Sequence, residues 1–480
     1  MAAPRAFLRS VEGKILLNNK WVSPTSKKLS SLYNPADNSL VSDKHAIGNQ
    51  IDVDAAVAAA RTAFHGPWSR FTGAQRGDAL YTLADLLNKN AEEAAYWESI
   101  CSGRVMSQLK YEVPWIASVI RYYAGWCDKL EGEVLSDSND GFYKIVRHEP
   151  LGVCAGITPW NGPLMVLALK AAPALATGNT FVLKPPEKSP LSSLFAGSLF
   201  EKAGFPEGVF NIVTGDGSTG AMLAAHMDVD KVSFTGSVPT GRKITDAANN
   251  SNMKRVTLEL GGKSPALVFP DAELPKAVQA LAQGITMNAG QVCVASSRVY
   301  AHEDIADELI AGIKKRFEEI TSTIGGDPQD LSTFFGPVVD THQYNLVHQF
   351  IEKGKMEAEL VTGGNKWEER GNYIPPTIFK EEIFGPVLCV RTFKTEEEAV
   401  ALANDSQFGL AAYVWTNDTK RILRITKQIQ AGSVGVNAGV SLFPNAPFGG
   451  YKSSGVGKEL GKYAIQDYTN VKTIFISLLR

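Results

Sequence analysis

Cys293 is the side chain in this sequence that is best placed to act as a nucleophile. It lies in the loop segment Gly290-Gln-Val-Cys-Val-Ala-Ser296, which follows a predicted helix. A cysteine nucleophile needs a nearby base and a group that stabilises the oxyanion formed on attack. The competing interpretation is a buried structural cysteine, which is the commoner role of this residue.

Two other glycine-rich segments could supply the missing groups. Glu259 lies between leucines in Leu258-Glu-Leu-Gly-Gly262, at a predicted strand end. Apolar surroundings raise the pKa of a carboxyl, which suits a general base. Asn161, in Pro159-Trp-Asn-Gly-Pro163, offers an amide donor on a stiff turn. The sequence alone does not show that these three side chains meet.

Three segments could bind phosphate or ribose groups. The segment 234–242 ends a predicted strand and opens a helix, so that Gly236, Ser237 and the free amides of the helix suit a pyrophosphate. Lys184 and Glu187 lie at another strand end and suit ribose hydroxyls, although a surface ion pair is an equal alternative. The segment 215–220, GDGSTG, matches GxGxxG but lacks the expected acid about 20 residues later, which favours a simple turn.

These residues belong to an alternating pattern of strands and helices. Apolar runs at 152–157, 180–183, 209–213 and 232–234 predict strands with helices between them, and hence a parallel, doubly wound α/β sheet with ligands at its carboxyl edge. A second α/β stretch runs from about 261 to 436 and begins with a helix over 272–288. The N-terminal third is predicted to be largely helical. The polar stretch 131–148 predicts a hairpin arm or a crossing between domains, and the terminal strand 470–479 either completes a sheet or pairs with another subunit.

Composition narrows the class of protein. The 480 residues suggest about three domain-sized units, and 48 Lys and Arg against 50 Asp and Glu leave no basic field for nucleic acid. No run of 18 apolar residues predicts a membrane span. Five cysteines without a CxxC pair, and histidines without ligand spacing, predict a reducing compartment and no metal. The start MAAPRAFLRS has no secretory core, so we expect a cytoplasmic protein, with organelle targeting left open.

The chain resembles the aldehyde dehydrogenase superfamily over nearly its whole length. The resemblance is carried, in the family's order and spacing, by ITPWNGPL, ALATGNTFVLKPPEKSP, FTGSVPTGR, LELGGKSP, GQVCVASSR, EEIFGPV, FGLAAYVWT and PFGGYKSSGVGKELG. It implies a Rossmann-type coenzyme domain (1–128 and 151–259), an α/β catalytic domain (260–468) and a β-arm (129–150 and 469–480) that joins subunits into dimers or tetramers.

The resemblance also implies an activity and its residues. An aldehyde would be oxidised to its acid with NAD through a cysteine thiohemiacetal and thioester. Cys293 matches the nucleophile, the Asn161 amide and the Cys293 N–H match the oxyanion donors, and Glu259 matches the base for hydrolysis. Lys170 and Glu459 match a proton relay around that base.

Further positions match coenzyme contacts. Lys184 and Glu187 match the contacts to the adenosine ribose, and Glu187 favours NAD, with NADP as a weaker alternative. Gly236 and Ser237 match the pyrophosphate turn, with Trp160 nearby. Glu382 and Phe384 match the clamp on the nicotinamide ribose.

The substrate channel departs from many relatives. Gly162 stands where an aromatic is common, and Leu169 where several have tryptophan; Met165 lies between them. We hypothesise a wider channel for a bulky or aromatic aldehyde, unless neighbouring loops fill the space. The alternatives are a semialdehyde-specific enzyme, for which Arg298 is the nearest cation, a CoA-acylating relative, which the presence of Glu259 disfavours, and a catalytically silent structural relative.

Overall fold

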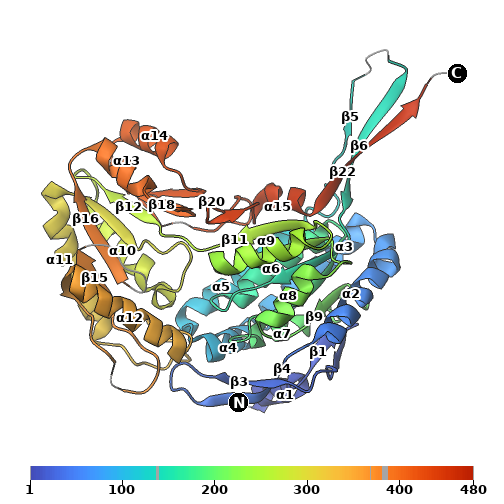
Figure 1. The fold of residues 1–480 in the computed structure, drawn as a ribbon, viewed down its shortest axis with the longest axis horizontal. Coiled ribbons are helices and arrows are strands. Elements are labelled where there is room, and N and C mark those ends of the chain that lie inside the picture. Colours follow the sequence, from blue (N-terminus) through green and yellow to red (C-terminus); the bar gives the residue numbers. More distant parts are fainter. Residues whose placement is uncertain (1, 137–139, 368, 381–386, 440, 479–480) are drawn as a thin grey trace.

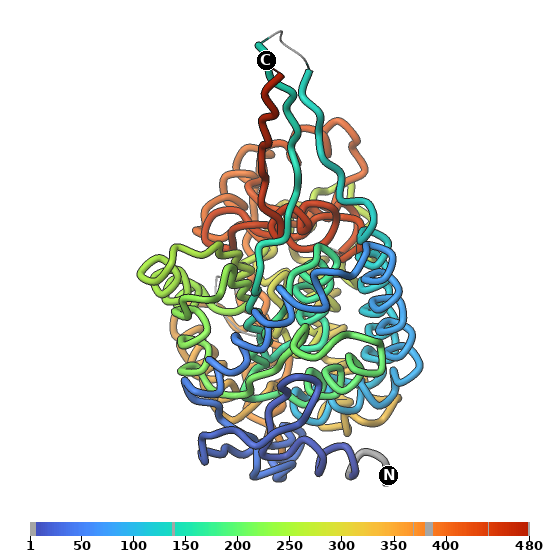
Figure 2. Tube along the Cα trace, turned by 90° about the vertical axis from the view of Figure 1, so that its right-hand side faces the viewer, coloured from blue at the N-terminus to red at the C-terminus, as the bar shows by residue number. Residues whose placement is uncertain are grey.

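Two sheets with helices on their faces form the body of the molecule, and a narrow three-stranded arm projects from it (Figure 1). The computed structural model describes residues 2–136, 140–367, 369–380, 387–439 and 441–478. Viewed from the side, the arm rises from the body as three adjacent strands that include the C-terminal segment (Figure 2). Glu382 and Phe384 lie outside the described residues.

The first sheet has eight strands. In spatial order they are β2 (Lys20–Val22), β1 (Ile15–Leu17), β9 (Phe210–Ile212), β8 (Thr180–Lys184), β7 (Val153–Ile157), β10 (Lys231–Thr235), β11 (Arg255–Glu259) and β21 (Gly455–Val456). Strands β9, β8, β7, β10 and β11 are parallel. The strand order reverses between β7 and β10, so a ligand site is expected at the carboxyl ends of those two strands. The four strands predicted from apolar runs are confirmed to within two residues at each end.

Helices surround this sheet. They are α1 (Ala2–Val11), α2 (Gln50–His65), α3 (Gly73–Lys89), α4 (Ala91–Ser102), α5 (Met106–Ala124), α6 (Pro163–Ala176), α7 (Leu191–Gly197), α8 (Gly217–Ala225), α9 (Val238–Asn249) and α15 (Gly461–Asp467), with a short 3-10 turn at Pro67–Arg70. The prediction of a largely helical N-terminal third is wrong for residues 15–46, which hold β1, β2, β3 (Leu29–Tyr33) and β4 (Leu40–Ala46). Leu16 pairs with Ile212, a partner almost 200 residues away that local periodicity cannot reveal.

The second sheet has seven strands. In spatial order they are β14 (Glu359–Thr362), β15 (Thr377–Lys380), β16 (Val387–Phe393), β13 (Arg298–His302), β12 (Pro265–Val268), β18 (Ala411–Trp415) and β19 (Ser433–Val436). All neighbours except β14 and β15 are parallel. Its helices are α10 (Leu274–Thr286), α11 (Ala306–Thr321), α12 (Thr341–Glu357), α13 (Glu396–Asn404) and α14 (Thr419–Gln428), with 3-10 turns at Met287–Gly290 and Glu303–Ile305. A small ladder joins β17 (Phe408–Gly409) to β20 (Tyr451–Lys452).

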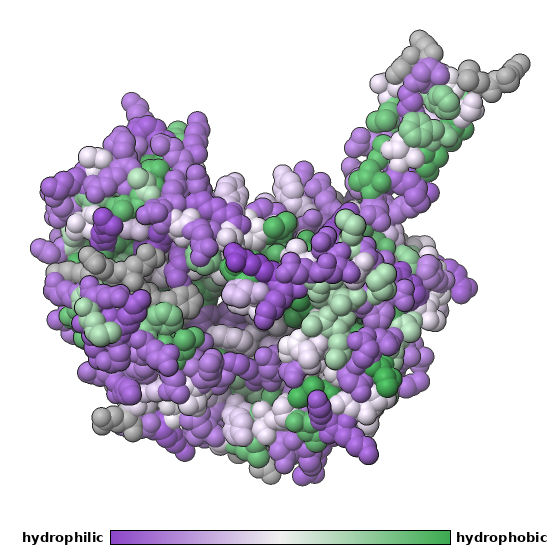
Figure 3. Space-filling model, viewed as in Figure 1, coloured by the Kyte–Doolittle hydropathy of each residue, from purple (hydrophilic) through white to green (hydrophobic). Residues whose placement is uncertain are grey.

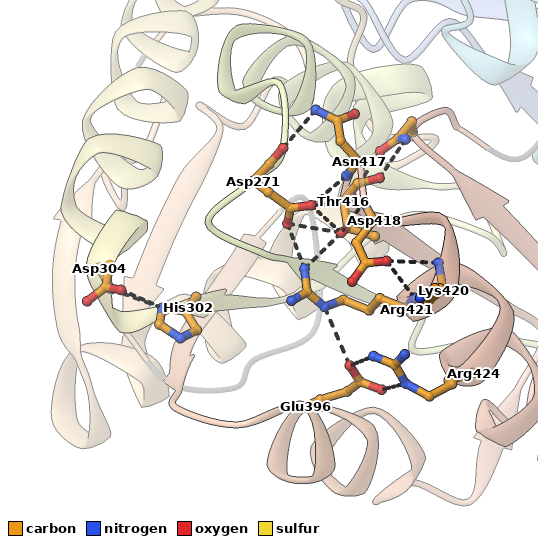
Figure 4. Close-up of polar contacts among 11 residues, drawn as sticks. Asp271, His302, Asp304, Glu396, Thr416, Asn417, Asp418, Lys420, Arg421 and Arg424 are labelled. Atoms are coloured by element: carbon orange, nitrogen blue, oxygen red, sulfur yellow. Dashed lines mark hydrogen bonds and ion pairs between the residues drawn. The ribbon is translucent and has the colours of Figure 1, made fainter.

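A polar network fixes the far end of β18 (Figure 4). Asp271, which follows β12, accepts hydrogen bonds from the Thr416 hydroxyl at 2.8 and 2.9 Å and from Arg421 at 2.7 Å. Arg421 in turn lies 3.5 Å from Glu396, which also pairs with Arg424. A carboxylate with this many donors holds the loop between β18 and α14 in one position.

The arm consists of β5 (Glu133–Val134), β6 (Phe142–Pro150) and β22 (Thr469–Ser477). Strand β22 pairs with β6 over nine residues, from Thr469 opposite Pro150 to Ser477 opposite Phe142. The terminal strand therefore completes a sheet within the chain. No helix in the described ranges is both long and apolar enough to cross a membrane.

Candidate functional site

The nucleophile loop lies between α10 and β13 and has an unusual backbone. The predicted helix over 272–288 ends at Thr286, and Asn288, Ala289 and Gly290 then all adopt positive φ angles of 49°, 51° and 74°. This left-handed turn is costly for alanine, so the surrounding structure must impose it. It carries the chain abruptly from the helix into the segment that bears Cys293.

Asn161 reaches this loop from the other sheet. It follows β7, just before α6, and its side-chain amide donates to the backbone carbonyl of Gln291 at 2.8 Å. The Asn288 amide returns a hydrogen bond of 3.3 Å to the Asn161 carbonyl. Residues 130 positions apart are therefore joined directly beside Cys293, as an amide donor for an oxyanion requires.

Cys293 is partly buried, and its thiol is held in the protonated form. Burial and the negative charge of Glu259 raise the pKa of Cys293 to about 12, while the backbone N–H groups of Cys293 and Val294 act in the opposite direction. A thiol in this state must lose its proton as it attacks.

Glu259 ends β11 and is 5% exposed, and neither of its carboxyl oxygens has a hydrogen-bond partner among the described residues. Burial and the charge of Glu459 raise its pKa well above the usual range, although the Lys170 ammonium opposes them. The carboxyl lies against Gly449, where a Cβ would come within 2.6 Å of Oε1. An unpaired carboxyl with a raised pKa has the properties of a general base or acid.

Lys170 and Glu459 form a buried ion pair behind this carboxyl. The fully buried Lys170 ammonium donates to Glu459 Oε1 at 2.5 Å and to the Ser233 hydroxyl at 2.9 Å. Ser233 also accepts from Thr257 at 3.1 Å. Lys170 is on α6, so the pair joins two distant parts of the chain. Glu459 is held in place by two backbone hydrogen bonds to Phe448.

Replacing Glu259 with glutamine is expected to stabilise the folded protein at neutral pH. Because the folded pKa of Glu259 lies above its ordinary value of 4.5, the folded state binds this proton more tightly than the unfolded chain does. The carboxyl therefore costs stability as the pH rises above about 4.5. The variant should gain in melting temperature over the wild type from pH 5 to pH 8, as measured by thermal unfolding. A wild type that melts higher than the variant at pH 8 would contradict this, and Glu207→Gln, at an exposed ion pair, is the control.

The predicted phosphate turn opens α9 beside Glu259. Ser237 is the N-cap of α9 and accepts from the Thr240 N–H, and the Gly236 N–H donates to the Glu259 carbonyl at 3.0 Å. A Cβ at Gly236 would lie 2.4 Å from the Phe234 ring, so only glycine fits. The open helix end next to a bare glycine turn fits a pyrophosphate.

The ribose candidates lie at the end of β8, which is separated from β10 by β7 in the same sheet. Lys184 is buried and donates to Glu187 Oε2 at 3.0 Å, while the Glu187 side chain is half exposed. Burial acts to raise the pKa of Glu187, but the Lys184 charge and hydrogen bonds outweigh it and lower that pKa. Trp160 lies nearby, with the Lys188 ammonium 5.9 Å from its ring centre. An ionised carboxylate here suits ribose hydroxyls and disfavours a 2′-phosphate.

Sequence reasoning missed His45 and explains the GDGSTG segment only in part. His45 is buried on β4, and its Nε2 has no hydrogen-bond partner in the part of the chain that the structure describes. Burial together with Lys184 lowers its pKa to about 4. Only the fold brings this strand to the coenzyme edge. In GDGSTG, Asp216 caps α8 by accepting from the Ser218 N–H at 2.8 Å, as in an ordinary helix start.

The proposed channel residues differ in their surroundings. Gly162 is extended, with a φ angle of −173°, and an added Cβ would lie 3.4 Å from the end of the Met165 side chain. Leu169 is buried in the hydrophobic core. Arg298 is also buried and donates to backbone carbonyls of Lys263 and Ala403, at 2.9 and 3.2 Å. It is therefore occupied away from the nucleophile loop and is a poor anchor for a substrate carboxylate.

No group of three or more His, Cys, Asp or Glu side chains within the described ranges could hold a metal ion. The described residues at this site offer a thiol for covalent catalysis and buried carboxyls for acid–base help. Figure 3 shows that this face of the molecule is hollowed near its middle, between the part that holds the first sheet and the part that holds the second.

Comparison with known proteins identifies the fold and its chemistry. The profile of the "Aldehyde dehydrogenase family" matches residues 21–474. An aldehyde dehydrogenase of Davidiella tassiana is 44% identical and covers 97% of this chain and 95% of its own length. Human retinal dehydrogenase 2 is 42% identical, with 100% of this chain and 94% of its own covered. The NAD+ complex of Bacillus cereus aldehyde dehydrogenase is 40% identical, has a TM-score of 0.95, and is covered over 99% of its length and 100% of this chain.

Proposed function

The chain belongs to the aldehyde dehydrogenase family and is an NAD-dependent enzyme of that family, and on this basis we propose how its residues act and which aldehydes it accepts. The single observation that carries the proposal is the hydrogen bond by which the Asn161 amide holds the nucleophile loop at Gln291, two residues before Cys293. Together with the buried carboxyl of Glu259, Asn161 and Cys293 are the three groups that thioester chemistry on a carbonyl requires.

We propose that the Cys293 sulfur attacks the aldehyde carbon as its proton passes to solvent. The oxyanion of the thiohemiacetal is stabilised by the Asn161 amide and the Cys293 N–H. NAD, when bound, would supply the hydride acceptor for the oxidation to a thioester. Glu259 then takes a proton from water, which attacks the thioester and releases the acid. Lys170 and Glu459 hold the proton that leaves Glu259.

The residues at the carboxyl edge of the first sheet would hold NAD. Gly236 and Ser237 would take the pyrophosphate, Lys184 and Glu187 the adenosine ribose, and Trp160 would border the site. Glu382 and Phe384 are proposed for the nicotinamide ribose from their sequence motif alone. The ionised Glu187 supports a preference for NAD over NADP, because it would repel a 2′-phosphate.

The test of this function is a panel of aliphatic, aromatic and carboxylated aldehydes with NAD or NADP, scored by absorbance of the reduced coenzyme. We expect turnover with at least one aldehyde class and a higher kcat/KM with NAD than with NADP. The absence of turnover across the panel would refute the function, and a preference for NADP would refute the role of Glu187.

The substrate is proposed to be a bulky or aromatic aldehyde. Gly162 presents no side chain, and the nearest atom to the space beside it is the flexible end of Met165, which can move aside, with Arg104 Nη1 at 4.0 Å. Buried Leu169 adds nothing to this wall, so the proposal rests on Gly162 and Met165. A semialdehyde is less suitable because Arg298 is already occupied by backbone carbonyls.

Gly162→Phe is expected to lower kcat/KM for an aromatic aldehyde at least tenfold and to change that for acetaldehyde less than about threefold. A ring at this position would fill the space beside Met165, and changes in pocket volume alter specificity by roughly this factor. The measurement is kcat/KM for both aldehydes in the wild type and the variant. Equal kcat/KM for both in the wild type, or unchanged aromatic turnover in the variant, would contradict the proposal.

The arm is proposed to join subunits into a dimer or tetramer. It carries a gathering of apolar side chains (Figure 3), and those of Phe475 and Val471 on β22 are 63% and 66% exposed. Such a surface on a projecting sheet is the kind that a second subunit covers.

The proposed domain limits are those of the two sheets and the arm, except that β21 and α15, from within 260–468, lie with the first sheet. The five cysteines of the chain form no disulfide in the described residues, which supports a cytoplasmic location.

Phe475→Asp is expected to convert the oligomer into a 51.8 kDa monomer, because a charge in a buried apolar interface is costly. Size-exclusion chromatography with light scattering measures the mass. Leu423→Asp, at a residue of α14 that is also exposed, is the control and should leave the mass unchanged. An oligomer that persists in Phe475→Asp at micromolar concentration would exclude this interface.

A further inference from the structure

One side of the nucleophile loop is not packed against a solid core. A cavity of about 290 Å³ lies between α10, β18 and the loop, and the side chains of Val292 and Val294, on either side of Cys293, line it together with Met287. Close packing is what normally holds a loop in one conformation. A loop that borders a cavity therefore needs a directional contact to keep its place.

Tyr413 makes such a contact. Its hydroxyl donates to the backbone carbonyl of Val294 at 2.5 Å, across 119 positions of sequence. The ring lines the same cavity, and the residue is 7% exposed.

The strand that carries Tyr413 is rigid. Residue 413 is in the middle of β18 and pairs with Ala266 of β12 on one side and with Gly435 of β19 on the other. A Cβ at Gly435 would approach the Tyr413 ring to 3.3 Å, so this glycine leaves room for the ring. The end of the strand is fixed by the hydrogen bonds from Thr416 to Asp271 (Figure 4). The hydroxyl is thus presented from a fixed position.

Val294 directly follows Cys293. Its backbone N–H, with that of Cys293, acts to lower the pKa of the Cys293 thiol, against the larger effect of burial. Its carbonyl is the group that Tyr413 holds. The N–H and the carbonyl belong to the two peptide units that meet at the Val294 Cα, so a fixed carbonyl limits the rotation of the residue that carries the N–H.

We propose that Tyr413 is a positioning residue of the active site, which acts through Val294 to keep backbone N–H groups directed at the Cys293 sulfur and its oxyanion. This inference rests on the proposed role of Cys293 as nucleophile. It assigns to a strand of the second sheet, far from Asn161 and Glu259 in sequence, a share in the reactivity of the thiol.

The test compares Tyr413→Phe with Trp415→Phe. Phenylalanine removes only the hydroxyl that reaches Val294. Trp415 lies two residues along on β18, lines the same cavity, and its Nε1 makes no hydrogen bond to any described residue, which makes it a matched control. The reaction measured is alkylation of Cys293 by iodoacetamide in the full-length protein without coenzyme, from pH 7 to pH 11, followed by peptide mass spectrometry.

We expect Tyr413→Phe to shift the pH profile of alkylation upward and to lower the rate at pH 8 about fivefold, the factor that corresponds to one hydrogen bond. The value of kcat should fall by a similar factor with little change in KM, and hydrogen–deuterium exchange of the peptide spanning 287–297 should become faster. Trp415→Phe should match the wild type in all three measurements.

An alkylation profile of Tyr413→Phe that coincides with the wild type would overturn the inference, as would an equal shift in Trp415→Phe. If Tyr413→Phe were poorly folded, exchange across the whole chain would rise; exchange confined to 287–297 supports the local role, and its absence there refutes it. Failure of the proposed function is recognised separately, because the wild type would then turn over no aldehyde of the panel, or Cys293→Ala would keep the turnover of the wild type.

Discussion

Replacing Cys293 with alanine is expected to abolish aldehyde oxidation while NAD still binds. The sulfur is the atom that would form the covalent adduct, and loss of a covalent nucleophile costs roughly 10⁴-fold or more in kcat. The proposed contacts to the pyrophosphate and the adenosine ribose lie at the start of α9 and the end of β8, by the first sheet, and do not involve this side chain. Steady-state formation of NADH and NAD binding by fluorescence titration measure the two parts of the prediction.

Cys389→Ala is the matched control. Cys389 is a buried cysteine on β16 and is expected to keep near-normal turnover when replaced. Measurable turnover in Cys293→Ala would remove Cys293 from its role. Loss of NAD binding in that variant would mean that the substitution disturbs more than the nucleophile.

Glu259→Gln is expected to separate the two halves of the reaction. Oxidation should still occur once, because the nucleophile and the oxyanion donors remain, and it should release a burst of NADH near one equivalent per site. Hydrolysis should then slow by about 10²- to 10⁴-fold, because glutamine cannot take a proton from water. Rapid-mixing absorbance gives the burst, and intact-protein mass spectrometry should find the acyl group on Cys293.

An unchanged steady-state rate in Glu259→Gln would remove the assigned role in hydrolysis. The absence of a burst together with a slow steady state would instead assign Glu259 mainly to deprotonation of the thiol. The control Glu207→Gln, at an exposed ion pair, should show neither effect.

Features that depend on neighbouring residues could be predicted from the sequence. The strands β7 to β10 are short buried apolar runs, and the helix after residue 272 has a clear periodic pattern, so both were recognised. The candidate side chains Cys293, Glu259 and Asn161 were singled out because each lies in a glycine-rich turn at an element end. The resemblance to a family then added their roles.

Features that depend on distant contacts could not be predicted. The bond from Asn161 to Gln291 and that from Tyr413 to Val294 each join residues more than 100 positions apart. The burial of His45 likewise arises only when β4 is placed against the coenzyme edge. Strands β1 and β2 have three residues each, too few for a periodic signal, and β1 pairs with the distant β9. Strands β3 and β4 are longer, but their sequences LSSLY and LVSDKHA contain no apolar run.

The short connection between the two sheets has a mechanical consequence. Glu259 is the last residue of β11 in the first sheet. Three residues later, Gly262 lies so close to the nucleophile loop that a Cβ there would be 2.7 Å from the Cys293 carbonyl oxygen. Three residues of chain span at most about 10 Å. The two parts of the molecule that hold the two sheets therefore cannot separate at this point. Any opening that admits or releases a coenzyme must pivot about it. The acid–base group and the sulfur would travel together through such a motion, so that the reacting pair keeps its spacing while the rest of the cleft widens.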